Sequence, residues 1–448
     1  MFLVDKIKTR IIKDKNLILK LIKTAFSRCV SAFGTLVFNF ALAKCLNVTD
    51  FGHFMLAYSI LVGLGFFARW GMPTAIIRFA GIMFADNEFG QIKKLRRDVL
   101  LRNLVATSIL GLLLILARSF LSDHFFEKSN VSGMLFVFAM ALPFYSYQTI
   151  QSSFFKAFKK PEIAPYFEIG LTTFLTGASV ALITFYGLHV DGFIVSICFF
   201  FSSMLITVLG FFTLSKLIET ATKGKKYHYE NYSGFYSSLN DYGLSAITGY
   251  LLKFSPAIFL GLFATGKDVG LYSLANSIAF VINFVSWIVN TVYSPHFAHC
   301  HKQNKIAELR GLYISSTFYM ALIAVPVFLL IIAFPSFFLN FFGHEYAAAK
   351  TALIIMAFAQ LFNVLTGQVY ALLNMTGHER KMRNIVLFTA ITSIVLSLIL
   401  IPYWGYVGAA IATATGLVLQ NSLAFYFSKK YLEIDFITVM NLFKSKQK

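Results

Sequence analysis

The sequence FGHFMLAYSILVGLGFFARWGMPTAIIRFAG, residues 51–81, is long enough and apolar enough to cross a lipid bilayer. About 20 consecutive apolar residues suffice for a membrane-spanning helix. The stretch nevertheless contains Arg69, and a charge inside a span costs about 2.5–3.5 kcal/mol on insertion scales, so it usually faces protein or water. Three residues later Met72-Pro73 interrupts the helix, because Pro73 has no N–H to donate to the Arg69 carbonyl. A cation beside a helix break predicts a polar cavity.

The composition of the whole chain is that of a membrane protein. Of its 448 residues, 57% are hydrophobic and only 13% are charged, and the mean hydropathy is +0.70. The apolar runs are about 20 residues long rather than short and alternating, which excludes a β-barrel. We therefore expect an all-α integral membrane protein.

The apolar runs number twelve, and they form two sets of six. The second set repeats the first at an offset of 218 residues: Asp50 corresponds to Asp268, and Gly187 corresponds to Gly405. We expect about 12 transmembrane helices in two pseudo-symmetric six-helix bundles, with a substrate site between the halves as in transporters. The predicted domains are a basic amphipathic segment at 1–25, an N-terminal lobe at 26–222, a C-terminal lobe at 223–428 and a basic tail at 429–448.

The basic residues predict the orientation of these helices. Of the 39 Lys and Arg residues, 31 lie in the two terminal segments and in alternate connections, and only 5 lie in the remaining connections. This bias predicts that both termini are cytoplasmic. It also accounts for the net charge of +19 through topology and anionic lipids, so we expect no nucleic-acid partner. The first 25 residues read as a helix on the membrane surface rather than as a cleavable signal peptide.

Four cations in or beside the spans are candidates for the cavity. Lys253 lies near the middle of its predicted span, and Arg69 lies in the cytoplasmic half of its own. Arg28, at the inner end of the first span, could equally be a topology anchor, and Arg78 could extend to the headgroups. For Arg69 this extension to the headgroups also remains an alternative.

Carboxylates are rare within the spans. Of 20 Asp and Glu residues, only Glu168 and Asp241 fall there, and these two are the candidate coupling carboxylates. A cavity with several cations and few acids suits an anionic ligand, and Arg and Lys are the usual partners of phosphate. We therefore expect a ligand that has phosphate or acidic sugar groups.

Uncharged polar residues on the spans could bind hydroxyl groups, although polar side chains also join transmembrane helices. The candidates for such contacts are Gln148, Asn240, Asn290 and Gln368. The cluster of His296, His299 and His301 has no accompanying carboxylate, and the sequence contains no nucleotide-binding or hydrolase motif. We expect no metal, no cofactor and no catalytic residue.

Five motifs resemble a known family, and together they extend over essentially the whole chain. They are AKCLNVTDFGHFMLAYSI (43–60), YGLHVDG (186–192), FFGHEYAAAK (341–350), ALLNMTGHERK (371–381) and IPYWGYVGAAIATATG (401–416). The chain resembles the polysaccharide biosynthesis flippases, the Wzx-type O-antigen transporters of the multidrug/oligosaccharidyl-lipid/polysaccharide exporter superfamily.

This resemblance implies a MATE-like pair of six-helix lobes around a cationic cavity. It also implies that the protein moves an undecaprenyl-pyrophosphate-linked oligosaccharide across the bacterial inner membrane during lipopolysaccharide or other surface-polysaccharide biosynthesis. Arg28, Arg69 and Lys253 lie at places comparable to the family's substrate-binding cations. The resemblance further implies polysaccharide polymerase and chain-length proteins as partners.

Two alternatives remain open at this point. A cation-coupled multidrug exporter of the same superfamily would need buried acids, of which only Glu168 and Asp241 are available. A membrane polysaccharide polymerase would need a large loop outside the membrane, whereas the longest outer connections, 120–131 and 334–349, hold about a dozen residues.

Overall fold

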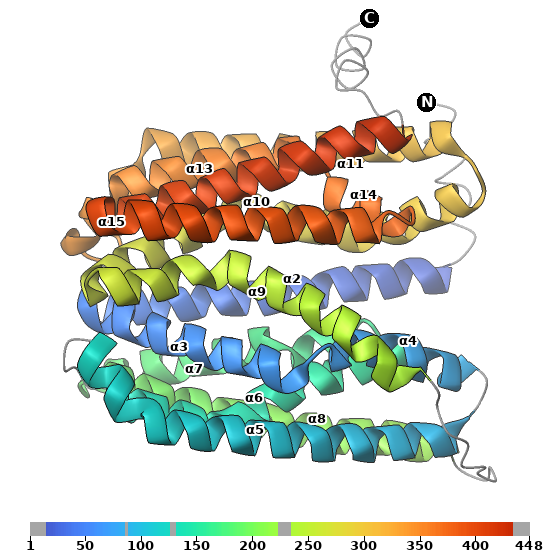
Figure 1. Cartoon of the computed structure of the whole chain (residues 1–448), viewed down its shortest axis with the longest axis horizontal. Coiled ribbons are helices and arrows are strands. Elements are labelled where there is room, and N and C mark those ends of the chain that lie inside the picture. The colour runs from blue at the N-terminus through green and yellow to red at the C-terminus, as the bar shows by residue number, and fades with distance from the viewer. Residues whose placement is uncertain (1–14, 86–87, 126–130, 223–233, 433–448) are drawn as a thin grey trace, which may run out of the picture. The chain divides into compact units, whose positions relative to one another are not determined.

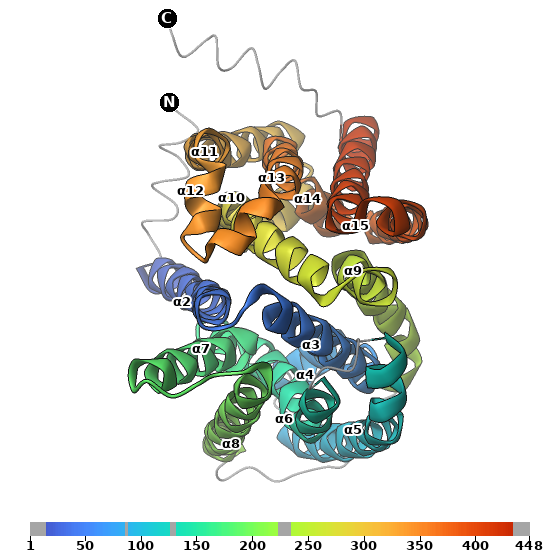
Figure 2. The ribbon, with the colours of Figure 1, turned by 90° about the vertical axis from the view of Figure 1, so that its left-hand side faces the viewer.

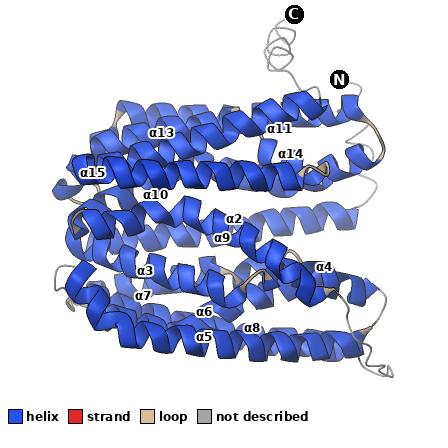
Figure 3. Cartoon of the chain, viewed as in Figure 1, coloured by secondary structure: helices blue, strands red, loops and turns tan. Residues whose placement is uncertain are grey.

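The computed structural model describes residues 15–85, 88–125, 131–222 and 234–432, and these contain helices and no strands (Figures 1 and 3). The chain divides into two compact units, Met1–Tyr250 and Leu251–Lys448. The boundary predicted after residue 222 stays a prediction.

The first unit is built around one helix, α6, which packs against α3, α4, α5 and α8 (Figure 2). Helices α2 and α7 pack against each other, and α7 also packs against α8. The helices are α2 (Lys15–Cys45), α3 (Val48–Arg69), α4 (Met72–Ala85), α5 (Phe89–Phe125), α6 (Val131–Ala157), η1 (Ala164–Phe167), α7 (Ile169–Phe185), α8 (Gly192–Thr222) and the first part of α9 (Phe235–Phe263).

Aromatic side chains join α3, α6 and α8 in the core of the first unit. The rings of Phe54 and Phe138 are 5.6 Å apart, and the rings of Phe138 and Phe199 are 5.7 Å apart; both pairs meet edge to face. All three side chains are completely buried. Because lipid tails are as apolar as these residues, such close packing, rather than exclusion from water, holds the helices together.

The second unit is arranged around α10 and α13. Helix α10 packs against α11 and α13, and α13 packs against α15. Helix α15 folds back on itself at Gly405, where the backbone leaves the helical conformation. The two arms are joined by a hydrogen bond from the Ser393 hydroxyl to the Ala412 carbonyl at 3.3 Å. The elements are α10 (Gly266–Lys302), α11 (Ile306–Ala333), α12 (Pro335–Asn340), η2 (His344–Ala349), α13 (Lys350–Leu365), α14 (Val369–Met375) and α15 (Glu379–Leu432).

Nine helices of the described chain are long and apolar enough to cross a membrane, or ten if the two parts of α9 form one span. In this count α15 enters once although it folds back, and α7 is too short to enter because it has 17 residues. The prediction of an all-α, multi-pass membrane protein is therefore confirmed. The exact number of twelve helices stays a prediction.

The repeat is visible in how corresponding helices begin. Helices α3 and α10 start at Val48 and Gly266, which is the offset found in the sequence. In α3, the Asp50 N–H donates to Asn47 Oδ1 at 2.8 Å; in α10, the Asp268 N–H donates to Thr265 Oγ1 at 3.3 Å. These caps satisfy N–H groups that the first helical turn leaves unpaired.

The turns that face these caps also correspond. Gly187 and Gly405 both have positive φ, at 73° and 49°. A Cβ on Gly405 would lie 3.0 Å from the Asp268 carboxylate, so the turn combines a left-handed backbone with a close approach that favours glycine. A Cβ on Gly187 would meet no atom within 4 Å, so the two units share the left-handed turn but not the close approach.

Candidate functional site

The break in the first span lies at Trp70-Gly71, before Pro73. Helix α3 ends at Arg69 and α4 begins at Met72, and φ is 27° at Trp70 and 74° at Gly71. Pro73 then occupies the first turn of α4, where a helix does not need the missing N–H. The sequence thus located the break correctly, but the left-handed pair and not the proline produces it.

Arg69 is buried at this break. Its side chain is 4% exposed, and its Cζ lies 4.9 Å from the ring centre of Phe66 and 5.4 Å from that of Tyr145 on α6. The Nη1 atom of Arg69 and the hydroxyl of Tyr145 are buried and have no hydrogen-bond partner among the described residues. A buried side chain does not extend to the headgroups as a snorkelling arginine would.

The charge of Arg69 has aromatic faces around it and no acid within ion-pair distance in the described part of the chain. Cation–π contacts of this kind contribute about 0.5–2 kcal/mol each. They offset only part of the cost of removing a cation from water. The arrangement leaves the positive charge of Arg69 without a compensating negative charge in the described structure. Its assignment as a substrate-binding cation stays a prediction.

Helix α9 covers the break from outside. Trp70 Nε1 donates to Asn240 Oδ1 at 3.0 Å, and Arg78 Nη1 donates to the Tyr242 hydroxyl at 3.2 Å. Asn240 and Arg78, two of the residues predicted from the sequence, thus both take part in the contact between this segment and α9. Both side chains are exposed, and Arg78 is less enclosed than Arg69.

Glu168 belongs to a second charged group, between α6 and α7. Its Oε1 lies 2.6 Å from Lys156 Nζ and accepts a hydrogen bond from the Ser152 hydroxyl at 2.9 Å. Both contacts are made to the same carboxylate oxygen, so Lys156 neutralises the charge of Glu168. Glu168 is therefore an ion-pair partner in the structure, and Lys156 is the residue that sequence reasoning missed.

The stability of the protein in detergent should consequently depend on the ion pair between Glu168 and Lys156. Glu168→Gln leaves the Lys156 ammonium without its acid partner, and breaking one side of a partly buried ion pair is destabilising. Thermal unfolding at neutral pH should therefore show a lower melting temperature for Glu168→Gln than for the native chain. Glu308→Gln, which alters the more exposed pair with Lys305, is the matched control. Equal melting temperatures for Glu168→Gln and the native chain would contradict the assignment.

All four residues predicted to make polar contacts are hydrogen-bonded to other residues of the chain, Asn240 to Trp70 as described above. Gln148 donates to the Ser203 carbonyl at 2.8 Å and accepts from Thr172 at 3.0 Å, which joins α6 to α8 and α7. Gln368 donates to the Ser286 carbonyl at 2.9 Å within the second unit. Asn290 accepts from the Ser294 hydroxyl. For Gln148 and Gln368 these contacts agree with the helix-joining alternative.

Two further predicted residues lie on α9, where their side chains are outside the described set. They are Lys253 and Asp241. The structure therefore leaves their assignments, as cavity cation and as coupling carboxylate, as predictions. Tyr145 was missed by sequence reasoning; the only signal was its place among many aromatic residues on an apolar helix.

The chain matches the sequence profiles of two protein families. Residues 21–301 match the profile of the family described as polysaccharide biosynthesis protein, and residues 243–399 match the MatE profile. The first match extends over more than half of the chain.

Two archaeal proteins illustrate the sequence relatives. A probable low-salt glycan biosynthesis flippase, Agl15 of Haloferax volcanii, is 25% identical over 224 residues, which are 49% of this chain and 47% of that protein. The match thus spans about half of the Haloferax relative. An uncharacterized membrane protein of Methanocaldococcus jannaschii, MJ1068, is 21% identical over 87% of this chain and 79% of its own length.

Solved structures show the same fold. An inward-facing multidrug resistance MATE family transporter of the MOP superfamily has a TM-score of 0.68 at 14% identity, covering 91% of this chain and 98% of its own. The lipid II flippase MurJ, in an inward closed conformation, has a TM-score of 0.68 at 15% identity, covering 92% and 87%. The resemblance inferred from the motifs is confirmed: this chain belongs to the polysaccharide biosynthesis protein family, and it has the fold of the MOP-superfamily transporters.

Proposed function

We propose that this protein is a flippase that translocates a polyprenyl-pyrophosphate-linked oligosaccharide, an O-antigen or another surface-polysaccharide repeat unit, across the inner membrane. The observation that carries the proposal is the family match over residues 21–301. The Haloferax relative, which is named as a glycan biosynthesis flippase, supports the same reading. Both termini would lie in the cytoplasm, as the distribution of Lys and Arg predicts.

The charges of the first unit support an anionic substrate. Arg69 is buried without an acid partner among the described residues, whereas Glu168 is already neutralised by Lys156. In our proposal Arg69, Arg28 and Lys253 bind the pyrophosphate, because guanidinium and ammonium groups donate several hydrogen bonds to phosphate oxygens. Polar side chains contact the sugars, and the polyprenyl tail stays in lipid.

Alternating access would supply the movement. The two lobes, 26–222 and 223–428, would expose the site first to one side of the membrane and then to the other. No bond is made or broken in this cycle, so no catalytic residue is required. A polysaccharide polymerase and chain-length proteins would receive the translocated unit.

The test is the leaflet distribution of the lipid-linked repeat unit. A strain that lacks this gene should accumulate the unit on the cytoplasmic leaflet, and the plasmid-borne gene should restore its appearance on the outer leaflet. The measurement is labelling of the glycan by a lectin or periodate that does not cross the membrane. Normal outer-leaflet labelling in the deletion strain would rule out the proposed function.

Export of drugs is the second candidate, and the MatE match at residues 243–399 favours it. A cation-coupled exporter needs ionisable acids in its transport path. Of the two candidates, Glu168 is engaged by Lys156 and Ser152. A strain that expresses this protein should therefore show unchanged resistance to cationic drugs. Increased resistance that depends on Asp241 would instead support the exporter.

A further inference from the structure

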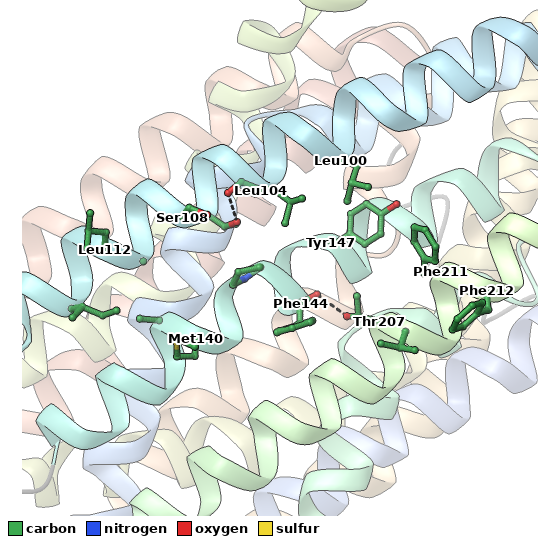
Figure 4. A pocket seen from close by; sticks show the side chains of 16 residues that line it. Leu100, Leu104, Ser108, Leu112, Met140, Phe144, Tyr147, Thr207, Phe211 and Phe212 are labelled. Atoms are coloured by element: carbon green, nitrogen blue, oxygen red, sulfur yellow. Dashed lines mark hydrogen bonds between the residues drawn. The ribbon is translucent and has the colours of Figure 1, made fainter.

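A groove of about 760 Å³ opens between α5 and α8 in the first unit, and α6 forms its floor (Figure 4). Its volume lies in the range of about 300–1,000 Å³ that is usual for small-molecule sites. The lining is almost entirely apolar, and no residue of the predicted transport site contributes to it: Arg28, Arg69 and Arg78 are all absent from its walls.

The groove exists because of the residues on its floor. Helices α5 and α8 both pack along α6 but touch each other only locally. Pro143 and the small residue Ala139 lie on α6 at the floor, and Gly111 on α5 lies against Ala139. The walls are large apolar side chains, among which Leu104, Leu112 and Met140 are exposed. A membrane lipid tail is the chemistry that such walls accept.

One end of the groove is polar. Leu100, Tyr147 and Phe211 lie there, and Leu112 and Met140 lie at the opposite end (Figure 4). The Tyr147 side chain is 4% exposed, and its hydroxyl lies beside the Arg96 guanidinium but makes no hydrogen bond of good geometry among the described residues. A buried hydroxyl without a partner costs free energy, which a ligand oxygen at this end would recover.

The cation Arg96 lies near the end of the groove that contains the Tyr147 hydroxyl. Arg96 lies one helical turn before Leu100 on α5, and its Cζ is 4.6 Å from the ring centre of Phe211. Its Nη2 donates to the Phe211 carbonyl at 3.3 Å and to the Ser215 hydroxyl at 2.8 Å. Both acceptors are neutral, and neither ion pair found among the described residues involves Arg96. The guanidinium of Arg96 also lies beside the Tyr147 hydroxyl, so its positive charge is at the same end of the groove.

We propose that this groove binds one anionic phospholipid of the surrounding bilayer. An acyl chain lies between α5 and α8, and the phosphate accepts hydrogen bonds from Arg96 and from the Tyr147 hydroxyl. The separation from the transport-site cations favours a bilayer lipid over the transported substrate. The proposal does not depend on the proposed function, because it concerns a different face of the first unit.

Binding of phosphatidylglycerol to the purified full-length protein tests the head of this site. Native mass spectrometry and thermal unfolding in detergent should show that phosphatidylglycerol binds more strongly than phosphatidylcholine with the same acyl chains. Arg96→Gln and Tyr147→Phe should each weaken the binding of phosphatidylglycerol by roughly tenfold, the loss expected for one charge-assisted hydrogen bond, and Arg96→Gln should also remove most of the preference for this net-anionic lipid over the zwitterionic phosphatidylcholine. Arg97→Gln, a change at the exposed neighbour of Arg96, should have no effect.

A second pair of variants tests the tail. Leu104→Trp and Met140→Trp narrow the groove and should abolish the preference for phosphatidylglycerol over phosphatidylcholine. Leu113→Trp, on the exposed side of α5 and outside the lining, should leave this preference unchanged. The melting temperature without lipid confirms that each variant is folded. Equal binding of both phospholipids by the native chain, or an unchanged preference in both Arg96→Gln and Tyr147→Phe, would overturn the proposal. Competition by undecaprenyl phosphate, but not by phosphatidylglycerol, would overturn the assignment to a bilayer lipid.

Discussion

Replacing Arg69 with methionine should reduce flipping by at least about tenfold, which is the effect of losing one hydrogen bond to a charged group. The same change should leave the protein as stable as the native chain, or more stable. The two results together would separate a substrate-binding cation from a structural one. Complementation of the deletion strain measures the first, and thermal unfolding in detergent measures the second.

The stability result follows from the surroundings of Arg69. Its guanidinium is enclosed by the rings of Phe66 and Tyr145, and its Nη1 has no partner in the described structure. Replacing buried charges with well-packed apolar residues of similar volume is often neutral or stabilising. A methionine would fill the same space and also contact the aromatic rings through its sulfur. An arginine that lowers stability is retained for function.

A conservative variant and a control test whether the effect of Arg69→Met is specific to this arginine. Arg69→Lys keeps the charge but not the planar set of donors, so it should retain part of the flipping activity. Arg97→Met removes an exposed cation on α5 that is not a candidate for the transport site, and it should change neither flipping nor the melting temperature appreciably. Full activity of Arg69→Met at equal protein level would remove Arg69 from the site.

The sequence predicted the position of the break near Arg69 but not what surrounds it. Periodicity and length were enough to find the helices, because transmembrane segments must satisfy their backbone hydrogen bonds internally. The contact of Arg69 with Tyr145 joins α3 to α6, and nothing in the sequence distinguishes this tyrosine from the others. Contacts between helices far apart in sequence depend on which faces meet, and a single apolar sequence leaves that choice open.

The repeat of 218 residues also predicted local features of the fold but not the differences between its two halves. It predicted the shared starts of α3 and α10, since a cap depends on residues within one turn. It also showed that Arg69 has no counterpart, because Trp287 occupies the matching position. The structure adds that α10 continues without interruption to Lys302, whereas α3 ends at Arg69. The break is therefore a property of the first half alone.

Replacing Gly71 with alanine should destabilise the protein more than any other single added methyl group at this break. Gly71 has φ of 74°, and a left-handed conformation costs an L-residue about 1–2 kcal/mol. A Cβ there would also lie 2.5 Å from the Leu239 carbonyl oxygen and 2.6 Å from the Gly243 nitrogen. Both atoms are backbone of α9, so the clash is relieved only if α9 moves away from the break.

The loss of function should exceed what the loss of stability explains. Moving α9 would separate Asn240 from Trp70 and would displace the segment that holds Arg69. Gly71→Ala should therefore lower the melting temperature and also flipping per folded molecule. Gly81→Ala is the control: this position lies within α4, where the nearest atom to a Cβ is 3.8 Å away, and alanine favours the helix by about 1 kcal/mol. A Gly71→Ala protein that melts and transports like Gly81→Ala would show that the break does not depend on this contact.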